Sequence, residues 1–383
     1  GGQRSLAFDA ITPDSFEPFG AVFDLTPTAG SVTLVRVGFS LRSVSQAQRN
    51  AQGTLRRPFE AITERAQGLW QNSLARFEVH GGSQEQRRIF YSALYHSLQK
   101  PSNWEGESPD WDGAPYYVDF ATLWDQYKTQ IPLLMTFFPG RGCDVVNTLL
   151  SLAERWGHFP NAFLLDADRE RCEGQARALA HTVIADAFHR RIDGIDWLRA
   201  YSVMEADLAH PRNRAFFETG KVEPPTHTLD LAYACFCTAR LARALGRHTR
   251  AATLLENAAN WRSVYDRATG RLVEGRYYEG GLWNYSFRLL HDMAGRIALY
   301  PTEQAFVADL DRFFGYGQPP VVQPTDPDDR EAMAAGLALN RFEGFNNEPD
   351  IEAPYAYVYA GRPDRTAEVV RAGMRSMFTT GRG

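Results

Sequence analysis

The 383-residue chain is 44% hydrophobic and 13% aromatic, which is ample material for a large core and is not typical of a disordered protein. Its 41 basic and 46 acidic residues give a net charge of -5, without a basic stripe of the kind that nucleic acid or an anionic membrane requires. The longest apolar runs, such as residues 131–139, are too short to span a bilayer. These features argue against a nucleic-acid partner and against a membrane span, and they favour a small ligand.

Residues 20–44 carry the signal of β-strands, because apolar and polar residues alternate there with β-branched residues and Gly/Pro breaks. One or two strands cannot bury a face alone. They are either the end of a sandwich that begins before residue 1, or they pack on the segments that come after them in the chain. We expect residues 1–44 to be the C-terminal strands of an N-terminal β-sandwich, in a chain that is a fragment.

From residue 45 the apolar period becomes helical, with Ser45 and Pro58 as the expected cap and first-turn residues, and we predict linker helices over residues 45–77. Residues 78–383 are predicted to form an almost wholly helical domain. Numerous helices with one apolar face form paired layers, and no motif repeats at a constant spacing. A double-ring α-toroid is therefore favoured over a solenoid. The predicted helical segments of this domain are 84–100, 119–138, 143–157, 173–190, 196–208, 226–246, 248–265, 303–315 and 362–378.

Trp124 and Asp125 offer a first candidate binding site, near the start of a predicted helix. An indole ring can stack on a sugar, and a carboxylate can accept hydrogen bonds from sugar hydroxyls. The alternative is a core tryptophan beside an aspartate that complements the helix dipole, and spacing alone favours that alternative.

Glu279 is the best candidate for a general acid. Two glycines follow it and allow backbone close to a ligand, and the aromatic residues from Trp283 onward would desolvate the carboxyl and raise its pKa. A surface glutamate in a glycine turn is the alternative. We predict Trp283 and His291 as further sugar-binding residues of this stretch, with a polar helix face as the alternative for His291.

Asn346, Asn347 and Glu348 place three oxygen donors side by side before Pro349. Ligation by oxygen alone suits Ca²⁺ rather than zinc, so this stretch is a candidate calcium site. The alternative is a helix entrance, in which Asp350 and Glu352 cap a helix that begins at Pro349 and the asparagines form the preceding turn. Both interpretations can hold together.

Four separated stretches together resemble glycoside hydrolase family 92, the calcium-dependent exo-acting α-mannosidases. They are "SALYHSL" with "PS", "LWDQYK" with "PLL", "YYEGGLWNYSF" with "HD", and "NNEPD" with "PYAYVYAGRP", in that order and spacing. The similarity covers nearly the whole chain from about Val35.

The resemblance implies an N-terminal β-sandwich, an (α/α)6 catalytic domain over residues 78–383 that is incomplete at its C-terminus, and an inverting mechanism. It also implies a Ca²⁺ that contacts mannose hydroxyls. Glu279 falls on the family's general acid, Trp124 and Asp125 fall in its sugar-binding motif, and Asn347 and Glu348 fall in its metal motif. The implied partner is a mannose-containing glycan with an α-1,2-type linkage, and the implied location is secreted or periplasmic.

The chain departs from the family pattern at two places, since "FNNEP" stands for the usual "HGNEP" and "EGG" for "EGN". The family's base carboxylate lies in a Gly-Asn-Asp-Asp run, which we expect beyond Gly383. Two alternatives stay open at this point. One is a mannosyl-phosphodiester hydrolase of the same family, and the other is a carbohydrate-binding or scaffold protein that lacks the base.

Overall fold

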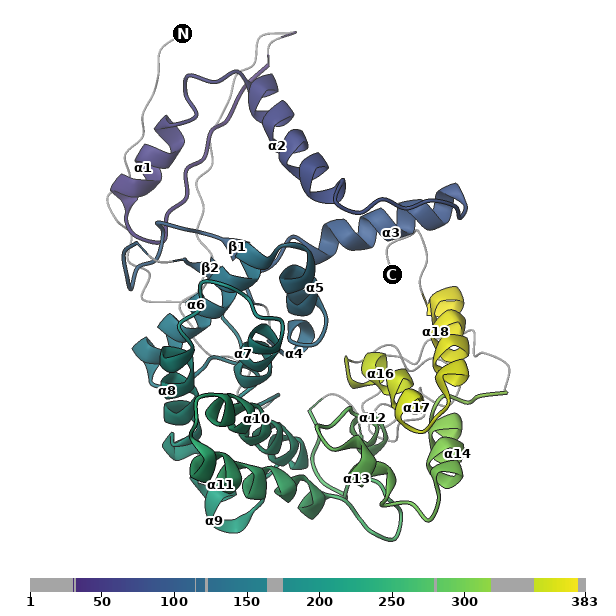
Figure 1. The fold of residues 1–383 in the computed structure, drawn as a ribbon. Coiled ribbons are helices and arrows are strands. Elements are labelled where there is room, and N and C mark those ends of the chain that lie inside the picture. Colours follow the sequence, from purple (N-terminus) through teal and green to yellow (C-terminus); the bar gives the residue numbers. More distant parts are fainter. Residues whose placement is uncertain are drawn as a thin grey trace. The chain divides into compact units, whose positions relative to one another are not determined.

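The computed structural model describes residues 30, 32–113, 115–120, 123–163, 175–278, 281–317 and 348–377. The chain divides into two compact units, Gly1–Pro58 and Phe59–Gly383. The described part of the chain is mainly helical, as the sequence predicted (Figure 1). No helix in it is both long and apolar enough to cross a membrane.

The helices of both units have these bounds: α1 Val44–Gln52, α2 Phe59–Leu74, α3 Gln84–Ser97, α4 Leu123–Gln126, α5 Gln130–Phe137, α6 Pro139–Trp156, α7 Ala180–His189, α8 Trp197–Leu208, η1 Pro211–Asn213, α9 Arg214–Thr219, α10 Pro225–Ala244, α11 His248–Ala258, η2 Ala259–Val264, α12 Leu282–Ser286, α13 Met293–Ile297, α14 Glu303–Phe313, α16 Glu348–Glu352, η4 Ala353–Tyr355, α17 Ala356–Tyr359 and α18 Pro363–Met377. The described strands are β1 Ser102–Asn103 and β2 Tyr117–Val118, which pair antiparallel.

The first unit contains α1, whose N-cap is Ser43, two residues before the predicted Ser45. The Ser43 hydroxyl accepts a hydrogen bond from the backbone N–H of Gln46, which satisfies one of the donors that a helix start leaves open. Residues 32–40 belong to the described part of the predicted strand region, which also includes residue 30 and residues 41–44. They form no strand, and most of their apolar side chains are exposed. The sandwich boundary at residue 44 and the linker at 45–77 stay predictions.

In the second unit, the segment predicted as one helix over 119–138 forms two helices, α4 and α5. The chain turns at residues 127–129 before α5 begins at Gln130. Pro132 lies in the first turn of α5, where a backbone N–H would have no acceptor within the helix, so its absence costs no hydrogen bond. In one continuous helix over 119–138, Pro132 would lie in the interior and remove a backbone hydrogen bond. The break places Lys128 in the turn between the two helices.

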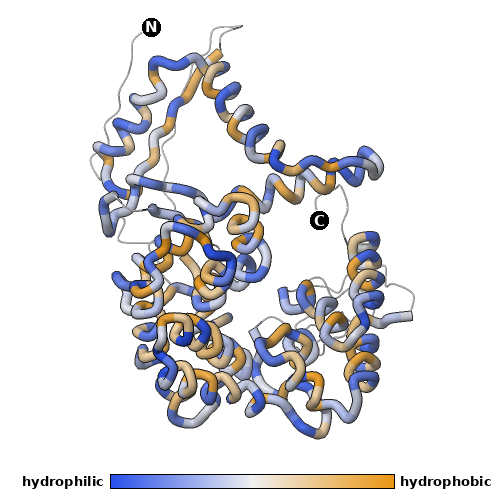
Figure 2. Tube along the Cα trace, viewed as in Figure 1, coloured by the Kyte–Doolittle hydropathy of each residue, from blue (hydrophilic) through white to orange (hydrophobic). Residues whose placement is uncertain are grey.

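Helix α10 packs against α7, α8 and α11 in this unit. It begins with Pro225 and is buried around most of its circumference. A helix that is buried on most sides belongs in a core, whereas α18 carries both apolar and polar residues along its length (Figure 2). Close packing extends to α5 and α6, because a side chain at Gly142 would meet Met135 at 2.8 Å.

A buried polar network ties these core helices together. His181 of α7 bonds to Asp207 of α8 at 2.9 Å and to Thr238 of α10 at 2.8 Å. The other carboxylate oxygen of Asp207 accepts from the backbone N–H of Phe159 and from Arg212, both at 3.0 Å. Burial acts to raise the pKa of Asp207, but the bond and charge of His181 and the charge of Arg212 hold that pKa below its ordinary value.

We expect Asp207→Ala to lower the free energy of unfolding by about 3–5 kcal/mol, because it leaves buried cationic and N–H groups without an acceptor. Chemical denaturation measures the change. The control is Glu218→Ala, which removes the exposed Arg214–Glu218 pair on α9 and is expected to cost about 0–1 kcal/mol. Equal effects of the two substitutions would contradict a stabilising role for the network.

Candidate active site

A cavity of about 610 Å³ opens in the second unit and is lined by residues of α4, α5, α7, α10, α16, η4 and α17. Its volume falls within the usual range of about 300–1,000 Å³ for small-ligand sites. Aromatic side chains and a comparable number of charged ones share the described lining, which is the mixture expected where one face of a ligand is apolar and its edge is polar.

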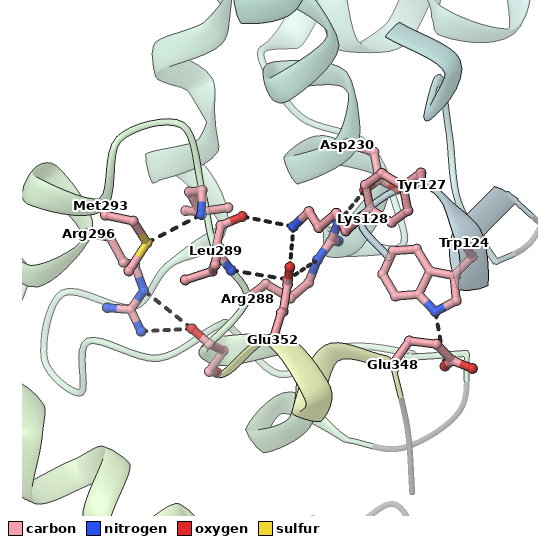
Figure 3. Close-up of polar contacts among 12 residues, drawn as sticks. Trp124, Tyr127, Lys128, Asp230, Arg288, Leu289, Met293, Arg296, Glu348 and Glu352 are labelled. Carbon is pink, nitrogen blue, oxygen red and sulfur yellow. Dashed lines mark hydrogen bonds and ion pairs between the residues drawn. The ribbon is translucent and has the colours of Figure 1, made fainter. Parts of the chain in front are cut away.

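Trp124 and Glu348 meet at this cavity, although 224 positions separate them in the sequence. Trp124 of the short helix α4 is 4% exposed, and its indole Nε1–H donates to Oε2 of Glu348, the first residue of α16, at 3.2 Å (Figure 3). The Arg288 guanidinium lies over the indole ring, 4.5 Å from its centroid. These contacts fix the indole on two sides and hold a carboxylate in the cavity lining.

Lys128 and Glu352 make a second contact across the same cavity. The Lys128 ammonium pairs with Oε2 of Glu352 and donates to the backbone carbonyl of Leu289 at 3.2 Å (Figure 3). The other oxygen of Glu352 accepts from the backbone N–H of Leu289 at 3.1 Å. Glu352 therefore joins α16 to two other segments. The helix-entrance interpretation expected Glu352 to cap its own helix. Among the described residues, its side chain instead bonds to Lys128 and Leu289.

Arg288 is 2% exposed and bonds to Asp230 of α10 at 2.9 Å and to the Tyr127 hydroxyl at 3.2 Å. Its Nε lies 3.8 Å from Glu352. A buried cation needs such partners, because desolvation without them costs several kcal/mol. Burial raises the pKa of the Tyr127 phenol, against the opposing charge of Arg288, so the tyrosine stays a neutral hydrogen-bonding group.

Asp350 and Asn284 lie behind the cavity lining. Asp350 is fully buried, and one of its oxygens accepts from the side-chain amide of Asn284 at 3.0 Å. The Asn284 carbonyl oxygen in turn accepts from the backbone N–H of Gly281 at 3.0 Å. Burial raises the pKa of Asp350 well above its ordinary value. This chain of bonds connects α16 to the residues that follow Glu279 and Gly280, and Asp350 does not cap a helix.

The predicted site residues have three outcomes. Glu279, Asn346 and Asn347 lie outside the described residues, so their placement stays a prediction. Trp124 and Glu348 line the cavity and contact each other. Asp125 also lines the cavity and is exposed there, so the structure brings these three predicted residues together.

Trp283 and His291 lie elsewhere and are not among the described residues that line this cavity. The Trp283 ring stacks on Phe313, with ring centroids 6.3 Å apart, and carries the Arg271 guanidinium 3.7 Å from its centroid. The His291 ring stacks on Phe236, which does line the cavity, at 4.9 Å. His291 thus supports the lining from behind, and sugar binding by Trp283 and His291 stays a prediction.

Sequence reasoning missed Lys128, Glu352, Arg288 and Asp230 as site residues, although all stand in stretches that it examined. Arg288 and Asp230 carry such a signal, because each is a charged residue flanked mainly by apolar ones, whereas Lys128 and Glu352 stand among other polar residues and carry none. Buried charges are costly unless paired, so isolated charges in apolar helices predict partners from other segments. The signal identifies Arg288 and Asp230 but not which charge pairs with which.

Comparison with known proteins identifies the family. The model of the glycosyl hydrolase family 92 catalytic domain matches residues 46–383. A curated relative, an uncharacterized secreted glycosidase of Arthroderma benhamiae, is 24% identical over 422 residues, covering 90% of this chain and 47% of the relative.

Two solved structures from Bacteroides thetaiotaomicron are similar to this fold. The family GH92 inverting mannosidase has a TM-score of 0.73 and 23% identity, covering 89% of this chain and 52% of its own. A family GH92 α-mannosidase has a TM-score of 0.75 and 20% identity, and the match covers 89% of this chain and 49% of the α-mannosidase chain. The chain thus spans about half the length of these relatives. The likeness confirms the predicted mainly helical (α/α)6 fold.

We expect His291 to stay neutral in the folded protein until the pH falls to about 4, because burial lowers the pKa of its imidazole to about 4. The unfolded chain binds that proton near pH 6.5. The free energy of unfolding should therefore decrease as the pH falls from about 6.5 to about 4. Above about pH 6.5 His291 is neutral in both states, so its titration does not change the stability there.

The comparison is with His291→Phe, which keeps a flat ring against Phe236 but cannot titrate. Chemical denaturation at several pH values should show the unfolding free energy of the variant improving relative to the parent as the pH falls through this window. A difference that is independent of pH would contradict the burial of His291.

Proposed function

Because the chain belongs to glycosyl hydrolase family 92, we propose that its protein is an inverting exo-α-mannosidase that removes terminal mannose, with an α-1,2-type linkage, from glycans. The observation that carries this proposal is the cavity in which Trp124, Asp125 and Glu348 meet. A fixed indole and two carboxylates provide a stacking surface and acceptors for sugar hydroxyls at one place. The activity is proposed for the whole protein, and this chain spans about half the length of the relatives it matches.

The similar structures support mannose as the sugar. Both are described as mannosidases, and the structure of one contains mannoimidazole. One of them is described as inverting. The curated relative is described as a secreted glycosidase, which supports a secreted location for this protein as well.

In the proposed reaction, Glu279 protonates the departing glycosidic oxygen while a second carboxylate removes a proton from the attacking water. The water oxygen bonds to the anomeric carbon on the face opposite the leaving group, and the glycosidic bond breaks. The products are mannose of inverted configuration and a shortened glycan. Inverting enzymes keep their two carboxylates about 6.5–9.5 Å apart to leave room for this water.

Glu348 fits the proposed Ca²⁺, because it offers hard carboxylate oxygens at the cavity lining and the bond from Trp124 engages only one of them. Asp350 adds a buried carboxylate oxygen without a partner among the described residues. Those residues contain no group of three or more His, Cys, Asp or Glu that could hold a metal. Asn346 and Asn347, outside them, are the further proposed ligands. When bound, Ca²⁺ would orient neighbouring hydroxyls of the terminal sugar.

We expect Glu279→Gln to lower kcat strongly, by about 10²–10⁴-fold, on mannosides with poor leaving groups, because the amide cannot donate the proton. The loss should be much smaller on aryl mannosides with acidic phenols, whose departure needs little protonation. Steady-state kinetics on α-mannobiose and 4-nitrophenyl α-mannoside measure both. Equal losses on the two substrates would remove Glu279 from the role of acid.

We expect a chelator to abolish activity of the full-length protein, and added Ca²⁺ but not Zn²⁺ to restore it, because an oxygen-rich shell prefers the larger hard cation. Glu348→Ala should raise the Ca²⁺ concentration needed for half-maximal activity. Glu256→Ala on the exposed face of α11 is the matched control and should leave that concentration unchanged. If Glu348→Ala leaves the calcium dependence unchanged, Glu348 is not a calcium ligand, and its role is limited to the hydrogen bond with Trp124.

A further inference from the structure

The helical run formed by α16, η4 and α17 turns one face toward the cavity. Glu348, Glu352, Tyr355 and Tyr359 all line it, at steps of four, three and four residues. That spacing is the period of a single helix face. At a rise of about 1.5 Å per residue the stripe extends roughly 16 Å, which is longer than one pyranose ring.

The tyrosines of this run divide between core and cavity. Tyr357 is fully buried, and its hydroxyl donates to Asp311 at 2.8 Å, so it anchors the helix. Tyr355 and Tyr359 are 49% and 58% exposed and line the cavity. Since Tyr357 and the buried alanines beside it already pack the helix, the two exposed rings are available to a ligand. We call Tyr355 and Tyr359 the aromatic wall.

Polar groups from other helices line the same cavity. Asp186 of α7 and Arg190, the residue that follows α7, pair at 2.8 Å, and Arg240 of α10 lines the cavity with them. A sugar ring presents apolar C–H groups on its faces and hydroxyls around its edge. A cavity with aromatic rings from one helical run and charged groups from two others matches both parts of such a ligand.

We propose that the aromatic wall binds the sugar residues on the leaving-group side of the scissile bond, so that the protein prefers mannose chains of three or more residues to shorter ones. This inference rests on the proposed function, which places the terminal mannose beside Trp124 and Glu348. The wall continues from Glu348 along the same helical face, so the penultimate and following sugars lie against Tyr355 and Tyr359. Neither tyrosine touches the reacting atoms, and the wall acts on chain-length preference.

The direct test is binding of mannose and α-mannotriose to full-length Glu279→Gln protein by calorimetry. We expect mannotriose to bind more tightly than mannose, and Tyr355→Ala with Tyr359→Ala to reduce that ratio of affinities about tenfold, as expected for the loss of stacking on two aromatic rings. Val358→Ala is the matched control. It lies between the two tyrosines, is 47% exposed and is absent from the described cavity lining, so it should retain the parent ratio.

Two results overturn the wall: mannotriose that binds no more tightly than mannose, or a ratio that the tyrosine substitutions leave unchanged. Thermal unfolding of each variant checks that the fold is intact. Hydrolysis of α-mannosyl fluoride, which has no sugar on its leaving-group side, tests the proposed function separately. If the parent protein hydrolyses α-mannosyl fluoride but the tyrosine substitutions leave the affinity ratio unchanged, the proposal for the aromatic wall is wrong and the proposed activity stands. If the parent protein does not hydrolyse the fluoride but the substitutions reduce the affinity ratio, the aromatic wall binds the sugar chain and the proposed activity is wrong.

Discussion

The bond from Trp124 to Glu348 and the pair between Lys128 and Glu352 are the contacts on which the cavity depends, because each joins segments 224 positions apart. The two donors lie four residues apart in α4 and the turn after it, and the two acceptors lie at the two ends of α16. A single contact would leave α16 free to rotate about it. Two contacts at matching intervals fix both the position and the orientation of this helix, and therefore of the cavity face that continues to Tyr359.

This arrangement requires charges in a poorly hydrated place, and Arg288 offsets part of that cost. Its guanidinium is shared among Asp230, the Tyr127 hydroxyl, the Trp124 ring and, at 3.8 Å, Glu352. Each partner supplies a fraction of the solvation that water would give, and removal of one leaves the others with an uncompensated charge. The same residue thus holds the indole from behind and neutralises the carboxylate that joins Lys128. The contacts of Arg288 that position the site residues are therefore the same contacts that compensate the buried charges.

Sequence predicted the fold well and the site in part, for physical reasons. Helix α8 follows from local signals that the segment itself carries, namely its apolar period and the N-cap Asp196, whose side chain accepts from the backbone N–H groups of Leu198 and Arg199. Trp124 and Glu348 stood out because their residue types suit sugar and metal. Their mutual contact, and the pairing of Lys128 with Glu352, depend on which distant segments meet, which no local pattern encodes. The stacking of Trp283 on Phe313 is a further contact of this kind that no local pattern indicates.

The two ends of the cavity differ in a way that bears on how a glycan would enter. Around Trp124 the walls are buried and cross-linked, with Tyr127 and Arg288 packed behind the indole. Toward Tyr355 and Tyr359 the lining is exposed and belongs to a helical run held from its other face by Tyr357. A glycan of the kind proposed above would therefore meet fixed side chains beside Trp124 and exposed rings beside Tyr355 and Tyr359.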